Sequence, residues 1–212
     1  MINQALIHQL SKVICRPDFE ELINEMDWKN VYRKLEAEIV KGLDSNAIGA
    51  FTRMLLDCNI NPLDTLVDIP PRYLRYDSKI TKLNIPSQVR RINSHAFEGC
   101  ENLAEVSFSE GLIELGRFVF GDTKISSLYL PDSLQRLNSL SLVSMENLSE
   151  ISLGPNVKGI DSETFGGDLS LTEIQYRGTK AQWSAALVPG FTEFWQSPIG
   201  IVRCTDGEVY YL

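Results

Sequence analysis

The sequence predicts an α+β chain in three parts: an N-terminal helical module, a short solenoid of about five 23-residue repeats, and a C-terminal cap of one helix and one hairpin. Three observations predict it. Apolar residues recur with a fixed period between residues 80 and 176, those before this stretch follow helical spacing, and a helical pattern and an Asp-Gly turn follow it. Such a period is typical of stacked repeats, because one repeat cannot bury its apolar residues alone.

The repeat is defined by apolar residues at offsets 0, 3, 5, 9, 12 and 17, so that the first unit leads to Phe97 at its last interior position. The five units start at Ile80, Leu103, Ile125, Leu148 and Leu171. The steps between these starts are 23, 22, 23 and 23 residues. Each unit contains two short strand-like pieces, such as 106–108 and 112–115, and side chains alternate along a strand. Stacking therefore predicts columns of outward-facing side chains.

The first unit also carries a recognisable consensus, because residues 85–103 read IPSQVRRINSHAFEGCENL. This stretch resembles the BspA-type leucine-rich repeat, and the resemblance extends from about Val67 to Leu212. Later units match it less closely, since Leu142 stands where Phe97 stands and only Cys100 fills the cysteine position. The resemblance implies a leucine-rich-repeat solenoid that binds other macromolecules, without catalytic residues or a cofactor. Chains that join a helical module to such repeats also look similar to proteins of tailed bacteriophages.

The N-terminal module is predicted to span residues 1–66 and the repeat domain residues 67–212, with the cap at 177–212. Apolar spacing predicts four short helices, at about 2–14, 17–26, 28–39 and 45–58. Residues 67–79 resemble the start of a unit that lacks its Phe97 counterpart, so we expect a truncated repeat and a continuous core across the junction. The module covers the first repeat, and a second role in binding stays open.

The end of the chain predicts a closing cap. Residues 180–187 are expected to form a short helix, and residues 199–212 a hairpin with Asp206-Gly207 in the turn. Four aromatic residues are expected to cover the last repeat, with a binding patch as the alternative. They are Trp183, Phe191, Phe194 and Trp195.

Composition and motifs exclude several classes of function. The net charge of −8 and a pI of about 4.9 argue against direct binding of nucleic acid. No apolar run approaches the roughly 18 residues of a membrane span, and the first residues lack a signal-peptide pattern, so we expect a cytoplasmic protein without membrane contact. Four scattered cysteines and two histidines predict no metal site. No nucleophile–base set or phosphate loop is present, so the chain is predicted not to be an enzyme.

The aligned columns predict where a partner protein binds. The first-strand columns contribute Lys82, Asn84, Glu105, Ser107, Tyr129, Glu150, Ser152, Glu173 and Gln175. The second-strand columns form a more basic face with Arg90, Arg91, Arg136 and Lys158. Tyr129, an aromatic residue among small polar neighbours, is the preferred anchor. Ordinary solvated surface is the alternative for each residue.

Three hypotheses of function follow from this pattern. The first is a non-catalytic protein-binding scaffold, encoded by a phage and binding or inhibiting a host protein in the host cytoplasm. The second is a structural or adhesion component of a virion or cell surface. The third is an acidic mimic of nucleic acid, which the moderate charge of mixed sign disfavours.

Overall fold

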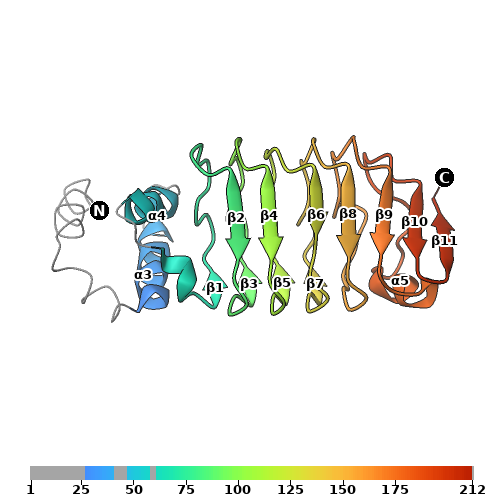
Figure 1. Cartoon of the computed structure of the whole chain (residues 1–212), viewed down its shortest axis with the longest axis horizontal. Coiled ribbons are helices and arrows are strands. Elements are labelled where there is room, and N and C mark those ends of the chain that lie inside the picture. Colours follow the sequence, from blue (N-terminus) through green and yellow to red (C-terminus); the bar gives the residue numbers. More distant parts are fainter. Residues whose placement is uncertain (1–26, 41–46, 58–60, 212) are drawn as a thin grey trace.

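The structure, a computed structural model, describes residues 27–40, 47–57 and 61–211 (Figure 1). Two helices lie before the repeats, α3 (Trp28–Val40) and α4 (Ala47–Asp57), which confirms the third and fourth predicted helices. The helices predicted at 2–14 and 17–26 lie outside the described residues, as do Cys15 and Cys58. A 3-10 helix, η1 (Pro62–Asp64), then leads into the solenoid.

The solenoid is a row of stacked turns, and its middle turns have one longer first strand and one shorter second strand (Figure 1). The first strands are β2 (Lys82–Ile85), β4 (Glu105–Phe108), β6 (Ser127–Tyr129), β8 (Glu150–Leu153) and β9 (Glu173–Tyr176). The second strands are β1 (Asp68–Ile69), β3 (Arg91–Ile92), β5 (Glu114–Leu115) and β7 (Arg136–Leu137). Neighbouring repeat strands pair in parallel, so the predicted leucine-rich-repeat solenoid is confirmed.

The second strands form one sheet in the order β1-β3-β5-β7, whereas the first strands form two. Strand β2 pairs with β4, and β6 belongs to a separate five-stranded sheet in the order β11-β10-β9-β8-β6. The interruption falls after the one repeat that is a residue short. In this unit the loop between Phe120 and Ile125 lacks a residue that the neighbouring loops have.

The core is continuous from the helices through the repeats. The last interior position of each full repeat is fully buried, at Phe97, Phe120, Leu142 and Phe165. Aromatic rings link the two parts of the chain: Tyr32 of α3 lies 5.7 Å from Tyr73, Tyr73 lies 6.0 Å from Phe97, and Phe97 lies 5.7 Å from Phe120 between ring centroids. One apolar cluster extends from Trp28 to Val202, which confirms the core predicted across the junction.

Polar contacts also hold the junction. The guanidinium of Arg53 on α4 donates to both carboxylate oxygens of Asp77, at 2.5 and 2.9 Å, and the backbone amides of Lys79 and Ile80 donate to the same carboxylate.

A truncated repeat is present, but it is the end of a unit and not the start: β1 pairs with the second strand β3, which sets Ile69 opposite Ile92. The Leu74 amide donates to the Ala96 carbonyl at 2.8 Å, so the buried Leu74 stands at the position of Phe97, and the missing piece is the first strand. The division into domains 1–66 and 67–212 stays a prediction, since packing runs across that boundary.

The C-terminal cap contains α5 (Lys180–Ala186) and the antiparallel hairpin β10 (Ile201–Cys204) and β11 (Gly207–Tyr210), as predicted. Strand β10 continues the first-strand sheet by pairing in parallel with β9. Trp183 is buried and donates its indole N–H to the Tyr211 hydroxyl at 2.7 Å. Phe194 is buried as well, but Trp195 is 49% exposed, so the expectation that all four aromatic residues cover the last repeat is only partly right. None of the described helices is long and apolar enough to cross a membrane.

Candidate binding surfaces

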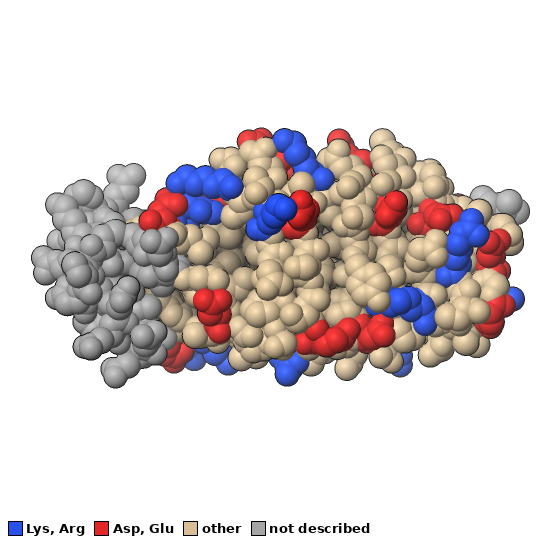
Figure 2. Space-filling view, in the orientation of Figure 1, with Lys and Arg blue, Asp and Glu red and all other residues tan. Residues whose placement is uncertain are grey.

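The predicted first-strand residues lie together on one side of the solenoid, here called the first-strand face. The register places Asn84 opposite Ser107, and it aligns Tyr129, Ser152 and Gln175 across three strands. This confirms the predicted alignment within each sheet, whereas no strand ladder joins β4 to β6. Figure 2 shows that charged side chains gather along the upper and lower margins of this side, with an uncharged area between them.

Tyr129 is a highly exposed aromatic side chain near the centre of the first-strand face, at 61%. The guanidinium carbon of Arg177 lies 4.0 Å from the centroid of its ring. Arg177 is itself held by four hydrogen bonds that cross two repeats: to the Ser152 hydroxyl at 2.5 Å, to the Leu130 carbonyl at 2.6 Å, and to Asp132 Oδ1 at 3.0 and 2.6 Å. Stacking on a fixed cation restricts the ring, so Tyr129 is ordered before a partner arrives.

The charges of the first-strand face are largely compensated. Lys82 pairs with Glu105 at 2.8 Å, and Arg203 pairs with Glu173 at 3.0 Å. The hydrogen bond to Glu173 raises the pKa of the Arg203 guanidinium. Among the described residues, Glu150 has no ion-pair partner. The face is therefore less acidic than the sequence suggests, and its free negative charge lies beside Tyr129, in a shallow groove of about 510 Å³.

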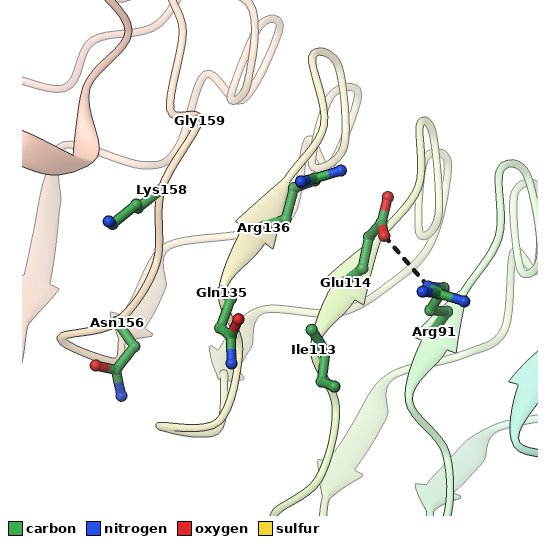
Figure 3. A pocket seen from close by; sticks show the side chains of 8 residues that line it. All are labelled: Arg91, Ile113, Glu114, Gln135, Arg136, Asn156, Lys158 and Gly159. Carbon is green, nitrogen blue, oxygen red and sulfur yellow. Dashed lines mark ion pairs between the residues drawn. The ribbon is translucent and has the colours of Figure 1, made fainter.

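A second groove lies over the short strands and is here called the second-strand groove (Figure 3). Its volume is about 630 Å³, and it is lined by Arg91, Ile113, Glu114, Gln135, Arg136, Asn156, Lys158 and Gly159. Three of the four predicted basic residues line it. The fourth, Arg90, lies outside the lining and donates to the Gly111 carbonyl at 2.9 Å.

The predicted column position of Lys158 is wrong by one residue. The repeat aligns Lys158 with Gln135, and the Lys158 amide does donate to the Gln135 carbonyl at 2.9 Å, but the carbonyl of Lys158 is shifted, so that Lys158 forms an isolated parallel bridge with Arg136. Gly159 explains the shift, because its φ of +84° turns the peptide and lets the Lys158 carbonyl accept from the Leu137 amide at 3.1 Å. A side chain is disfavoured there, both by this φ and because a Cβ atom would lie 2.9 Å from the Leu137 carbonyl oxygen.

The interior offers little for chemistry. Burial raises the pKa of the Cys100 thiol to about 12, which keeps it neutral and poorly nucleophilic. Burial also raises the pKa of Asp168 to about 8. Within the described ranges, no group of three or more His, Cys, Asp or Glu side chains is arranged to hold a metal ion.

Comparison with known proteins identifies the family. Residues 68–186 match six copies of the BspA type leucine rich repeat region, and the chain belongs to this family. No curated protein matches the chain. Six is also the number of predicted units when the truncated repeat is counted with the five full ones.

Solved structures that are similar to this chain share little of its sequence. The pneumococcal vaccine antigen PcpA is 15% identical over 66% of this chain and 40% of its own, with a TM-score of 0.50. A leucine rich cell surface protein of Faecalibacterium prausnitzii is 23% identical over 51% of this chain and 35% of its own, with a TM-score of 0.45. A leucine-rich repeat protein of Bacteroides ovatus is 19% identical over 55% and 30%, with a TM-score of 0.43. The chain thus spans 30–40% of the length of these proteins.

Sequence reasoning missed two cations of the first-strand face, Arg177 and Arg203. Arg177 could have been found, because it occupies the turn position where other units have Pro86, Ser109 or Pro131, and a long cation there is unusual. Arg203 lies outside the repeat. It joins the column only because β10 pairs with β9 and sets Arg203 opposite Gln175, a contact between distant segments that no local pattern encodes.

Proposed function

We propose that the chain is a non-catalytic protein-binding scaffold that acts through its first-strand face, with Tyr129 as the anchor. The ordering of the Tyr129 ring by Arg177 carries this proposal. Tyrosine is enriched at binding hot spots, since it contributes a large contact area at low cost in conformational entropy. A ring that is ordered in the free protein loses less freedom on binding.

The surroundings of Tyr129 also define the partner. Small polar side chains flank the ring on β8 and β9, at Ser152 and Gln175, and leave room for a protruding side chain of the partner. Glu150, without an ion-pair partner among the described residues, is positioned to meet a basic group. Charges at the rim of an interface improve orientation and association rate more than affinity. The partner is therefore a protein that presents an apolar or aromatic group next to a lysine or arginine.

The origin and location of the chain belong to this proposal as well. In its more specific form, the proposal is that the chain is encoded by a phage and binds or inhibits a host protein in the cytoplasm of the host cell. This form rests on the resemblance of the helical module and repeats to phage proteins, and it needs no cofactor or membrane. The helical module, of which residues 1–26 lie outside the described ranges, stays a cap with an optional role in binding.

Affinity capture tests the proposal. The tagged chain should retain one stoichiometric protein from a lysate of the cells in which it acts. Tyr129→Ala should weaken that complex about 30-fold or more, as expected for an anchor worth about 2 kcal/mol. Glu150→Lys should slow its association. Tyr76→Ala is the matched control, because Tyr76 is 54% exposed in the turn before β2, outside the first strands, and its ring also lies against an arginine, Arg75, at 4.5 Å.

The same experiment distinguishes the alternatives. If neither Tyr129→Ala nor Glu150→Lys changes capture, the first-strand face is not the binding site. Copurification with virus particles or cell envelopes would instead favour a structural or adhesion component. Competition between DNA and the chain for the captured protein would favour the acidic mimic of nucleic acid.

A further inference from the structure

The second-strand groove contains two uncompensated positive charges. Arg91 is paired with Glu114 at 3.4 Å and with Asp68 at 3.7 Å, so its charge is balanced. Neither Arg136 nor Lys158 has an ion-pair partner in the described part of the chain. The whole chain carries a net charge of −8. A local excess of positive charge in such a chain is a property of this groove and not of the surface at large.

The two charges also lie next to each other. Arg136 and Lys158 are bridge partners on neighbouring repeats, at a backbone spacing of about 4.8 Å. Like charges directly opposite each other on neighbouring strands are destabilising. Figure 3 shows their charged ends turned away from each other. The left-handed Gly159 creates this pairing, since it moves Lys158 one position out of the repeat alignment.

We propose that the second-strand groove binds an acidic segment of a partner protein, with carboxylates of that segment placed between Arg136 and Lys158. Local arrangements that cost stability concentrate at functional sites, and a bound anion removes the repulsion. Same-side residues of an extended segment repeat at about 6.7 Å, a distance that the long arginine and lysine side chains can span. This surface is separate from the first-strand face, so the inference stands without the proposed function.

The rest of the lining fits a peptide better than a single anion. The amide side chains of Gln135 and Asn156 lie along the groove below the cations (Figure 3), and each can both donate to and accept from a peptide backbone. Ile113 is 37% exposed and offers an apolar contact. A groove of about 630 Å³ is also much larger than one phosphate or carboxylate.

Nucleic acid fits this groove less well. Duplex DNA carries one negative charge per about 1.7 Å of helix axis, and binding it takes several unpaired cations in a row. Here Glu114 lies between Arg91 and Arg136 in the same strand column and would repel a phosphate backbone. A short acidic segment needs only the two free cations.

Fluorescence anisotropy with a defined probe tests the inference. The probe is a fluorescein-labelled octapeptide of alternating Asp and Glu, and the control peptide carries Asn and Gln instead. At low ionic strength we expect saturable binding of the acidic probe only, with affinity falling as salt is added. The double variant Arg136→Gln/Lys158→Gln should weaken binding about tenfold, equal to about 1.4 kcal/mol.

A matched double variant separates this site from general charge. Lys34→Gln/Lys124→Gln removes the same two charges outside the groove and should change the affinity less than about twofold, because exposed distant charges are screened. Equal losses in both double variants, or equal binding of the neutral peptide, would overturn the inference. Full competition by millimolar inorganic phosphate would also contradict it, as would tighter binding of a single-stranded oligonucleotide through the same two residues.

Thermal unfolding separates loss of binding from loss of structure. Lys158→Glu reverses one charge of the like-charged pair, so it should abolish peptide binding while raising the Tm. Tyr129→Ala should leave binding of the acidic peptide unchanged. A lower Tm together with lost binding in Lys158→Glu would mean that Lys158 supports the fold and would contradict the assigned role.

Discussion

The first-strand face and the second-strand groove are built by the same repeats, yet most charges are paired on the face whereas two cations are unpaired in the groove among the described residues. On the first-strand face a typical carboxylate is matched, as Glu173 is by Arg203. In the groove, Arg136 and Lys158 lie opposite each other, without a carboxylate partner among the described residues. The repeat therefore fixes where the columns of side chains lie, whereas the residue type at each position decides whether the charges of a column are compensated within the chain. One scaffold can therefore present two surfaces of different specificity.

The largest expected effect on stability comes from a substitution in the core that supports both surfaces. Phe120 is fully buried, 5.7 Å from Phe97 and 6.2 Å from Phe108 between ring centroids. Phe120→Ala should lower the free energy of unfolding by about 3–5 kcal/mol, because it leaves a cavity between stacked repeats. Urea denaturation measures the loss. A change below about 1 kcal/mol would mean that the repeats do not share one packed core.

A second shared element is the buried carboxyl of Asp168. Its Oδ1 accepts from the Met145 amide at 2.7 Å, its Oδ2 has no partner among the described residues, and burial raises its pKa from 3.8 to about 8. Since the folded pKa lies above the unfolded pKa, the folded state holds the proton more tightly. Stability should therefore fall as pH rises from about 4 to 8, by at most about 1.4 kcal/mol per pH unit.

Asp168→Asn isolates this pH effect. An asparagine oxygen can still accept from the Met145 amide, and the side chain no longer titrates. Chemical denaturation at pH 5, 6, 7 and 8 should show a shallower dependence for this variant than for the parent chain. Parallel curves for the two proteins would show that Asp168 does not titrate in this range.

Arg177→Ala tests the ordering of the first-strand face alone. The substitution removes four hydrogen bonds and exposes one side of the Tyr129 ring. It should cost about 1–3 kcal/mol of stability, because the Leu130 carbonyl loses its charged donor. Arg177→Ala should also weaken binding of the captured partner protein, whereas binding of the acidic octapeptide should not change. Arg203→Ala, at a more exposed pair, is the control and should destabilise much less.

Lys158→Glu is the smallest expected change, and it has the opposite sign. An acidic residue opposite Arg136 converts a like-charged pair into an attractive one. The free energy of unfolding should rise by about 0.2–1 kcal/mol, and high salt should reduce the gain. Thermal denaturation at low and high ionic strength measures both effects. An unchanged or lower stability would mean that the two side chains do not repel each other in the free protein.

Much of the fold could be predicted because the repeat is a local pattern written several times. Offsets of apolar residues placed Phe97, Phe120 and Phe165 in the core, and the strand register aligned the first-strand columns as expected. The hairpin was predicted from Asp206-Gly207 for the same reason, since turn chemistry is local.

The remaining features depend on contacts between distant segments or on one unusual backbone angle. The Arg177–Tyr129 stack joins residues 48 positions apart in the sequence. Arg203 lies in the first-strand column because β10, which follows the helix α5, pairs in parallel with β9. Lys158 moved by one position because Gly159 adopts a left-handed conformation, which the residue type permits but does not require. The partner-binding role of each predicted site residue stays a prediction.

A crossed titration tests most directly the claim that the two surfaces are independent. The captured partner and the acidic octapeptide are each titrated against Tyr129→Ala and against Arg136→Gln/Lys158→Gln. We predict that Tyr129→Ala lowers only the affinity for the partner protein, about 30-fold or more, and that the double variant lowers only the affinity for the peptide, about tenfold. If either variant weakened both ligands to the same extent, the two surfaces would be one site and the account would be wrong.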